Sequence, residues 1–415
     1  MTRLLYQALL VLALPWVWLR LFVRARREGA YLERRSERFG HVPAGLSSGA
    51  VWFHTVSAGE TNAAAPLIRA VQQRFPDVPF LVTTMTPTGS ARVKALLGDT
   101  VEHCYAPYDY PWAVGRFLRR TRPKALVLME TELWPNLVAR TAASGTPVYL
   151  VNARLSERSY RGYRRVASLV RQMLGDIDRI VCQYEDTAAR FRALGARSVE
   201  VAGNVKFDAE MPPDPFGVGD LGFGDSPVWI AGSTHGGEEE IVLDAHRRLR
   251  ERFGELKLIV APRHPERAAM VAELAIDRGF STGLLSARPI GVDVLIGDVM
   301  GTLPHLYPHA LVAFVGGSLD RTGGHNPIEA AVHGLPFAMG PAIHNVEEIC
   351  ERFAAAGCFH PVLDADGLAD VVGDLLSDPC RRRREGESGQ RVVAQNRGAR
   401  QAVVDRLCDA LGGTP

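Results

Sequence analysis

The 415-residue sequence has few lysines, no paired cysteines and almost no net charge. Its six cysteines are scattered without a CxxC pair, which argues against a disulfide scaffold and favours a reducing, cytosolic setting. The formal net charge is +2, so no global field marks a nucleic-acid-binding protein. HExxH and P-loop signatures are missing as well. We therefore expect no metal ion, no cofactor and no nucleic-acid partner.

The one strong charge asymmetry is at the N-terminus, where residues 1–40 hold eight Arg and three acidic residues. An apolar stretch, Leu4–Leu19, precedes an arginine cluster and lacks an A-x-A cleavage site. We predict that residues 1–27 are an uncleaved anchor in the inner membrane, near anionic lipid, with the rest of the chain on the cytoplasmic face. Whether the anchor spans or lies in the interface stays open, and a buried helix of a soluble domain is the alternative.

Beyond residue 48, short β-rich runs alternate with amphipathic helical segments. Such alternation predicts an α/β fold with parallel sheets and helical crossovers. Two Rossmann-like domains are expected, facing a cleft at the carboxyl ends of their strands. The expected strands are Val51–Val56, Phe80–Met85, Ala125–Met129, Val148–Val151, Ile180–Gln183, Val228–Ala231, Leu256–Ala261, Val292–Ile296, Leu311–Val315 and Pro336–Met339.

The border between the two domains is predicted from proline and glycine. Residues 212–227 contain eight of them in sixteen positions, which no regular element tolerates. We therefore expect an N-terminal domain over 28–211, a linker over 212–227 and a C-terminal domain over 228–415. The last helix has the option of packing back on the N-terminal domain.

Candidate catalytic residues of the first half follow predicted strands. Ser57 and Glu60 have the spacing of a capping box, so they either only start a helix or place a base at the cleft edge. Glu130 and Glu132 follow another strand and form either an acid/base pair or an acidic helix start. Asn152 begins a polar segment after the next strand.

Lys206 is one of only four lysines against 44 arginines. A compact ammonium near the end of the first domain could stabilise negative charge on a substrate. The alternative is an ion pair with Asp208 that braces the linker.

Candidate anion-binding residues of the second half also follow strands. The segment from Ala231 to Glu238 has small residues and hydroxyls before a helix, which suits a phosphate. Arg263 follows the next strand and is either a phosphate ligand or a surface charge. Asn326 as N-cap and Glu329 in the first turn would begin a further helix, and Glu329 could hold a ribose diol.

These motifs together resemble the 3-deoxy-D-manno-octulosonic acid (Kdo) transferases of lipopolysaccharide synthesis, membrane-associated glycosyltransferases of the GT-B fold. The resemblance covers nearly the whole chain. The segments that carry it are Glu37–Gly40, His54–Glu60, Thr83–Gly89, Glu130–Asn136, Asn152–Ser156, Gly203–Asp208, Ser233–Glu239, Pro262–Arg267, Phe314–Leu319 and Gly323–Glu329.

The resemblance implies transfer from CMP-Kdo to a lipid A precursor such as lipid IVA, with inversion and without metal. It implies that Glu60 is the general base, and we place Lys206 and Glu130 beside it as catalytic residues. The expected acceptor-binding residues are His54, Ser57, Asn152 and Arg154. The expected donor-binding residues are Ser233, Thr234, Arg263, His264, Gly317, Ser318, Asn326 and Glu329.

Two positions depart from the family pattern, Thr302 in place of Glu and Ala342 in place of His. Donor contacts at these positions are not expected to follow the family.

Two other classes compete with the transferase: a sugar-nucleotide epimerase or hydrolase of the same fold, and a membrane scaffold. The number of Kdo residues added and the oligomeric state are not encoded in these motifs.

Overall fold

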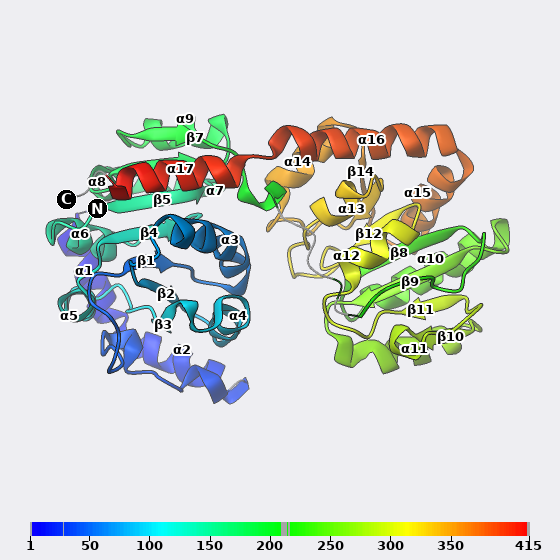
Figure 1. Cartoon of the computed structure of the whole chain (residues 1–415), viewed down its shortest axis with the longest axis horizontal. Helices are drawn as coiled ribbons and strands as arrows, with labels where there is room; N and C mark the ends of the chain where they lie inside the picture. The colour runs from blue at the N-terminus through cyan, green and yellow to red at the C-terminus, as the bar shows by residue number, and fades with distance from the viewer. Residues whose placement is uncertain (1, 28, 209–213, 215, 413–415) are drawn as a thin grey trace. The chain divides into compact units, whose positions relative to one another are not determined.

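The computed structural model describes residues 2–27, 29–208, 214 and 216–412. The chain divides into two compact units, which are described separately. The first unit comprises residues 1–208 and 397–415, and the second comprises residues 209–396. Both units are built on a parallel sheet (Figure 1).

The first unit contains a seven-stranded sheet in the order β3-β2-β1-β4-β5-β6-β7. All pairings between neighbouring strands are parallel, with Val51 opposite Phe80 on one side and Ala125 on the other. After β1, the chain adds β2 and β3 on one side, and it then adds β4 to β7 on the other side. The strands are β1 (Val51–His54), β2 (Phe80–Thr84), β3 (Glu102–Tyr105), β4 (Ala125–Met129), β5 (Val148–Ala153), β6 (Arg179–Cys182) and β7 (Val199–Val201).

Helices cover both faces of this sheet because the central strands are apolar on both sides. Trp52 and Leu126 pack on one face with α5, α6, α8 and α9, while Phe53 and Val127 pack on the other with α3, α4 and α17. The bounds are α3 (Ala58–Arg74), α4 (Pro87–Leu97), α5 (Pro111–Thr121), α6 (Pro135–Ala143), α7 (Glu157–Arg165), α8 (Ala167–Gly175), α9 (Glu185–Ala193) and α17 (Ala399–Gly412).

The second unit contains another seven-stranded parallel sheet, in the order β10-β11-β9-β8-β12-β13-β14. Here the first strand, β8, lies beside β9 and β12, so the order again reverses next to the first strand. The strands are β8 (Val228–Thr234), β9 (Lys257–Pro262), β10 (Thr282–Leu284), β11 (Val294–Ile296), β12 (Ala313–Val315), β13 (Phe337–Met339) and β14 (Phe359–Pro361).

The second sheet is also covered on both faces. Trp229 and Phe314 pack with α10, α11 and α15, whereas Phe337 meets Phe353 of α14 edge-on, with ring centroids 5.1 Å apart. The bounds are α10 (Glu238–Arg252), α11 (Ala268–Ile276), α12 (Leu303–Leu306), α13 (Ile328–Val332), α14 (Glu347–Ala355), α15 (Ala365–Ser377) and α16 (Pro379–Asn396).

The ten strands predicted from the sequence are all present, and the prediction of parallel sheets is confirmed. The strands that were not predicted are β3, β7, β10 and β14. Each of them lies at the edge of its sheet.

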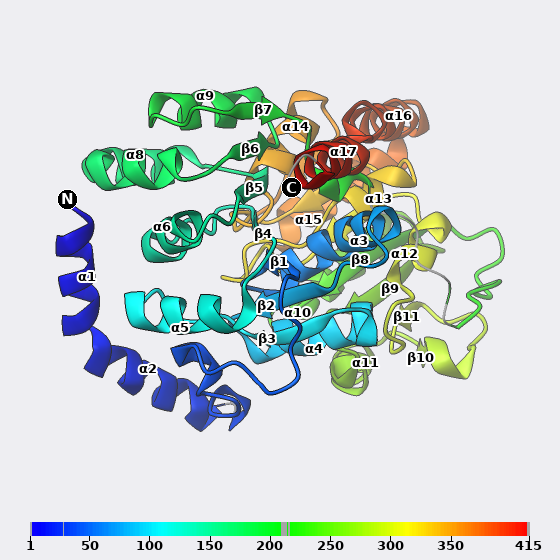
Figure 2. The same ribbon diagram turned by 60° about the vertical axis from the view of Figure 1, so that its left-hand side comes forward.

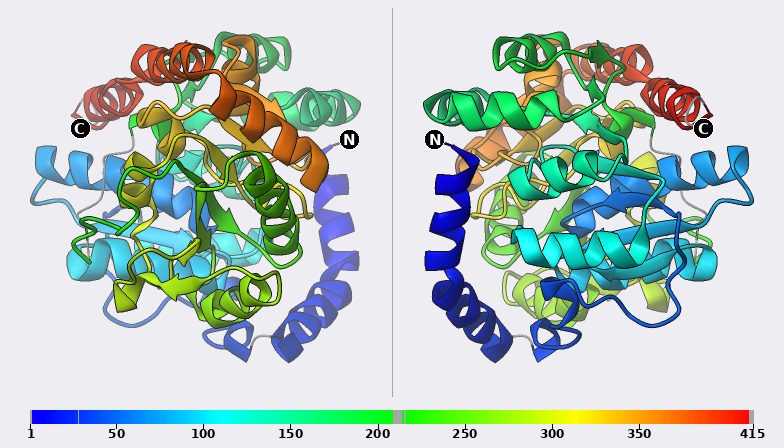
Figure 3. Two further views of the ribbon diagram at one scale, coloured as in Figure 1. Left: turned by 90° about the vertical axis from the view of Figure 1, so that its right-hand side faces the viewer. Right: turned by 90° about the vertical axis from the view of Figure 1, so that its left-hand side faces the viewer.

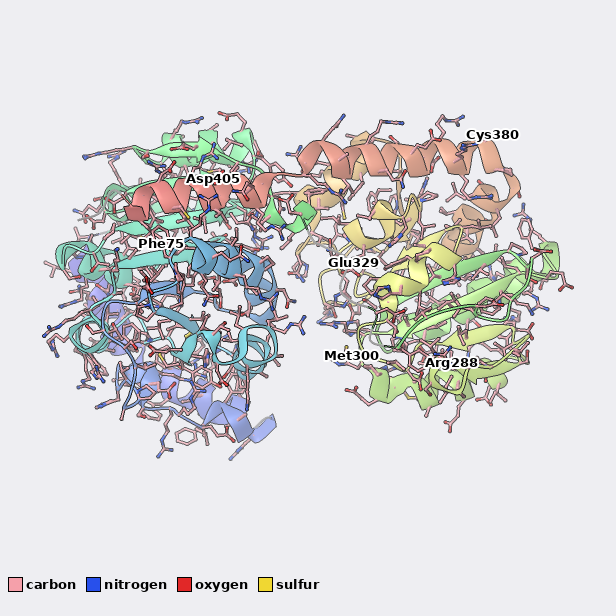
Figure 4. All side chains as sticks on the ribbon, viewed as in Figure 1. Phe75, Arg288, Met300, Glu329, Cys380 and Asp405 are labelled. Carbon is pink, nitrogen blue, oxygen red and sulfur yellow. The ribbon has the colours of Figure 1, made fainter. Side chains whose placement is uncertain are left out.

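The predicted domain borders differ from the two units. The apolar face of α17 packs in the core of the first unit, with Val403 and Leu407 buried, so residues 397–415 do not belong to the second unit. Figure 4 labels Asp405 on this helix, and its carboxylate lies 2.9 Å from Arg74 of α3.

The predicted linker at 212–227 is also partly wrong. Residues 212, 213 and 215 lie outside the described residues. Within the part that is described, Leu221 and Phe223 are buried, and Gly291 donates its backbone N–H to the Gly222 carbonyl. Leu221 and Phe223 therefore anchor part of this proline- and glycine-rich segment within the second unit.

The N-terminal segment forms two helices, α1 (Arg3–Leu12) and α2 (Leu14–Arg27). Among the described residues, no one helix has both the length and the apolar composition to cross a membrane; Arg3–Leu12 and Leu14–Arg26 meet these criteria only together, with a 52° bend between them. Figures 2 and 3 show these helices along one side of the first unit.

Two polar side chains fix α1 to the first unit. Tyr6 donates a hydrogen bond to Asp109 Oδ2 at 2.8 Å, and Gln7 donates one to Asn136 Oδ1 at 2.7 Å. Asp109 also accepts the backbone N–H groups of Asn136 and Leu137, at the start of α6. One face of α1 is thereby docked next to the loop that follows β4.

Candidate active site

Polar residues of the first unit gather where β1 and β4 end. These two strands flank the point at which the strand order reverses, the usual ligand site of such sheets. Glu60 lies in the first turn of α3, after β1, and Glu130 and Glu132 follow β4. The prediction that both motifs stand at strand ends is thus confirmed.

Glu60 is nearly buried, with 8% of its surface exposed. Its Oε2 accepts the backbone N–H of Val56 at 2.8 Å, and its Oε1 accepts the Ser57 hydroxyl at 3.0 Å. Ser57 in turn accepts the Glu60 N–H at 3.3 Å, as a helix cap does. Burial, followed by the negative charge of Glu132, raises the pKa of Glu60 to about 8. The residue therefore caps the helix and also has the proton affinity of a general base.

Glu130 lies between two cations. Its carboxylate is 3.1 Å from Arg154 Nε and 3.2 Å from Lys206 Nζ. Its backbone has φ = 53°, a strained conformation that points to a special role for this turn. The alternative pairing of Lys206 with Asp208 is wrong, because Asp208 accepts backbone N–H groups of residues 398 and 400 instead.

Glu132 completes a cluster of three carboxylates and two cations. The indole Nε1 of Trp134 donates to Glu132 Oε2 at 2.9 Å. Burial, and then the charge of Glu130, raises the pKa of Glu132. Because the carboxylates outnumber the cations Arg154 and Lys206 by one, a single shared proton makes the cluster neutral.

His54 lies under this cluster and not on its surface. The ring has no exposed surface, its Nδ1 is 2.9 Å from Thr83 Oγ1, and it meets the Trp134 ring edge-on at 4.9 Å. Burial lowers its pKa to about 3, so the ring is neutral. Direct contact between His54 and an acceptor is incompatible with this burial, and the ring supports Trp134 instead.

The other predicted acceptor-binding residues have different surroundings. Asn152 is buried with φ = 51°, and its Oδ1 accepts the backbone N–H of Val205 at 3.2 Å. Arg154 and Ser57 are partly exposed. Asn152 thus holds the start of the segment that carries Lys206, whereas Arg154 and Ser57 retain surface for a ligand.

The second unit has its polar residues at the corresponding place, where β8 and β12 end. Glu238, the first residue of α10, is 1% exposed. Its two oxygens accept four backbone N–H groups at 2.8–2.9 Å. The donors belong to His235, Gly317, Ser318 and Leu319. One carboxylate therefore ties the loop after β8 to the loop after β12.

The residues predicted to bind the donor lie at the end of β8, on the loops after β9 and β12, and in the first turn of α13. Arg263 and His264 are exposed, so both are available to a ligand. Ser233 has φ = 56° and is partly exposed. Thr234 is buried, and its Oγ1 has no hydrogen-bond partner among the described residues.

The loop after β12 and the first turn of α13 carry the other predicted donor ligands. Ser318 is fully buried and donates its hydroxyl to the Val315 carbonyl at 2.8 Å, so its side chain holds the loop. Asn326 Oδ1 accepts the N–H of Ile328 at 3.2 Å, one residue away from the cap geometry predicted. Burial raises the pKa of Glu329, which is labelled in Figure 4, and the Arg263 charge opposes that shift.

The two departures from the family pattern have structural roles. Thr302 is buried and donates its hydroxyl to the Val299 carbonyl at 2.8 Å. Ala342 donates its backbone N–H to the Ser318 carbonyl at 2.9 Å. The sequence interpretation missed Glu238, His235 and His325 as site residues, although all three lie within motifs that it identified.

Comparisons with known proteins assign the family. A family model described as 3-deoxy-D-manno-octulosonic-acid transferase matches residues 33–209. The 3-deoxy-D-manno-octulosonic acid transferase of Haemophilus influenzae is 36% identical over 98% of both chains. That of Bordetella pertussis is 36% identical over 96% of this chain and 97% of its own.

A solved structure shows the same fold. UDP-GlcNAc 2-epimerase from Neisseria meningitidis, bound to UDP-GlcNAc, has a TM-score of 0.60 and 15% identity, covering 87% of this chain and all of its own. The two parallel-sheet α/β units resemble those of GT-B glycosyltransferases. The relatives that match along nearly the whole length, together with the strand-end motifs, place this chain in the family of Kdo transferases, which are glycosyltransferases.

Proposed function

We propose that this protein transfers Kdo from CMP-Kdo to a lipid A precursor such as lipid IVA, with inversion at the anomeric carbon. The observation that carries the proposal is Glu60, a nearly buried carboxylate of raised pKa at the end of β1. Inverting transfer needs one base at the acceptor hydroxyl and no covalent intermediate. The identity of the transferred sugar is inferred from the relatives, and the identity of the base is inferred from the surroundings of Glu60.

In the proposed reaction, the acceptor oxygen forms a bond to the anomeric carbon while the bond from that carbon to the phosphate oxygen breaks. The acceptor proton passes to the ionised Glu60 carboxylate, and CMP leaves with the electron pair. A base with a pKa near the working pH combines sufficient ionised population with sufficient basicity. The charge of Glu132 helps to keep Glu60 in that range.

Lys206 and Arg154 are proposed to balance the charge of the carboxylate cluster during the reaction. Both hold Glu130, so they limit the net negative charge of the cluster when Glu60 is ionised. Lys206 is also proposed to stabilise negative charge on the substrate, and Ser57, Asn152 and Arg154 to shape the acceptor site. His54 acts indirectly, through Trp134.

The donor is proposed to bind the loops of the second unit. Arg263 and His264 suit the phosphate because both are exposed and both have side-chain N–H groups to donate. Glu329 suits the ribose diol, and Gly317 gives close access to the backbone. Ser318 and Asn326 are then proposed to hold the loop after β12, and Ser233 and Thr234 to shape the end of β8.

The protein is proposed to work at the cytoplasmic face of the inner membrane. Residues of α1 and α2 expose large apolar side chains, and arginines follow them in the sequence. Such a surface suits contact with an anionic lipid interface. The exposed apolar residues are Leu4, Leu5, Leu9, Val11, Leu12, Trp16, Leu19, Phe22 and Val23.

Incubation of the protein with CMP-Kdo and lipid IVA in detergent tests the function. Mass spectrometry should detect CMP together with a glycolipid heavier by one or more Kdo residues, with activity retained in EDTA. Release of CMP without glycolipid would indicate a hydrolase. No reaction with CMP-Kdo, but turnover of another sugar nucleotide, would indicate an epimerase of this fold. Loss of activity in EDTA would contradict the metal-free mechanism.

A further inference from the structure

Two histidine rings meet where β8 and β12 end. The Nε2 atoms of His235 and His325 are 2.8 Å apart, and the rings are nearly parallel, with an interplanar angle of 8°. A hydrogen bond between two imidazole nitrogens requires that one carries a proton and the other does not. The pair can therefore keep this bond either as two neutral rings or with one additional proton, but not with two.

Backbone contacts join the two loops that carry the rings. Glu238 Oε2 accepts the N–H of His235 at 2.9 Å and the N–H of Gly317 at 2.8 Å, which joins the two loops. Gly317 has φ = 66°, and a Cβ at this position would lie 2.7 Å from the His325 ring. The glycine thus leaves the space that the ring occupies. A pair held in this way is organised before any ligand arrives.

Polar and charged groups from several loops face the pair. Arg263 and His264 come from the loop after β9, and the His264 ring is edge-on to His235 at 5.8 Å. Burial lowers the pKa of both paired rings, that of His325 to about 4, and Arg263 acts in the same direction. Asp320 opposes these shifts, as does Glu238 for His235. Without a ligand, the pair is therefore neutral at pH 7.

We propose that His235 and His325 bind the phosphate of the nucleotide donor as a pair that gains one proton on binding. The proposal rests on the proposed function, because that function makes the donor a cytidine monophosphate sugar. An anion close to the rings favours their charged form. The additional proton comes from solvent and no covalent bond changes.

The charged pair would serve the reaction in two ways. Each ring would present an N–H from its Nδ1, which has no hydrogen-bond partner among the described residues, to a phosphate oxygen. The positive charge would also offset the negative charge that develops on the departing phosphate. Arg263 would then share the phosphate with the pair instead of holding it alone.

Calorimetric titration of the full-length protein with CMP tests the proposal. Measurements at pH 7.5 in two buffers of different ionisation enthalpy give the number of protons exchanged. At this pH CMP is mostly a dianion, since the second pKa of a phosphate monoester is about 6. We expect uptake of about half to one proton per CMP. Cytidine, which lacks the phosphate, should bind without proton uptake.

Variants test whether the two paired histidines, and not another histidine, take up the proton. H235Q and H325Q keep a polar side chain but remove the shared proton, so proton uptake should disappear and CMP affinity should fall roughly 10- to 100-fold. H309Q alters an exposed histidine outside these loops and should match wild type. Melting temperatures identify any variant that fails to fold, and wild-type proton uptake is informative without any variant.

The outcomes distinguish this proposal from the proposed function. If CMP binds to the wild-type protein without proton uptake, or if H235Q and H325Q take up the same proton, the histidine pair is not the phosphate ligand and the donor site stands. Equal uptake with cytidine would likewise overturn the proposal. If CMP does not bind at all, the proposed donor site itself is wrong.

Discussion

Two glutamates occupy related places in the two units and are held differently. Glu60 lies in the first turn of α3 after β1, and Glu238 begins α10 after β8. Both are largely withdrawn from solvent, with 8% and 1% of their surfaces exposed. Glu60 accepts one backbone N–H and one hydroxyl, whereas Glu238 accepts four backbone N–H groups.

The two carboxylates therefore differ in what their hydrogen-bond partners allow, although the two units share one topology. Four backbone N–H groups bind the Glu238 carboxylate, so its oxygens are occupied in holding the two loops. Glu60 has fewer donors and has the negative charge of Glu132 nearby, which raises its affinity for a proton. We therefore expect the first unit to exchange a proton at its carboxylate, whereas the carboxylate of the second unit joins the loops after β8 and β12.

The largest expected effect is that of E60Q. The amide keeps the size of the side chain and its contact with Val56, but it cannot accept a proton. Turnover should fall by about 10²- to 10⁴-fold, the usual contribution of a general base, while CMP binding stays unchanged. Turnover within threefold of wild type would mean that Glu60 only caps α3, as Glu238 only braces its loops.

The corresponding substitution in the second unit, E238Q, should lower the free energy of unfolding. Its amide NH₂ would face two backbone N–H donors, leaving them unpaired at a cost of about 2–6 kcal/mol. Urea unfolding should show this loss, with weaker CMP binding because Gly317 and His235 lose their common anchor. Wild-type stability together with lost turnover would reverse the comparison and make Glu238 the reactive carboxylate.

The fold was predictable wherever strands are buried on both sides. The central strands are continuous apolar runs, and all of them were predicted. The four edge strands were missed because only one side of each is paired and most of their residues are partly exposed, which weakens the hydropathy signal. The place of α17 was not fixed by local pattern either, because its partner α3 lies far away in the sequence.

The sequence predicted which segments lie at the strand ends, but it did not predict which side chains pair with one another there. Motifs after β1, β4, β8 and β12 could be located because strand ends of parallel sheets carry ligands. The pairing of Lys206 with Glu130, and of His235 with His325, depends on which strands become neighbours. Glu238 looked like a helix start because its four donors come from distant backbone.

Lys206→Met sharpens the comparison by removing one of the cations from the first site. The methionine keeps the apolar stem, and Arg154 still holds Glu130, so the melting temperature should change little. Turnover should fall substantially, because the carboxylate cluster loses a balancing charge. Lost stability with normal turnover per folded molecule would assign Lys206 to structure alone. Lys257→Met, at an ion pair in the second unit, is the matched control.

The smallest expected effect is that of E132Q, which tests why Glu60 binds its proton tightly. The amide can still accept the indole N–H of Trp134, but the negative charge beside Glu60 is lost. The pKa of Glu60 should fall, because a like charge that disfavours ionisation has been removed. The acid limb of the pH–rate profile should then move to lower pH, and the rate below the wild-type limb should rise by at most about tenfold if the limb moves by a full pH unit. An unmoved limb would mean that burial alone sets the basicity of Glu60, and that the contrast with Glu238 lies only in the number of hydrogen-bond donors.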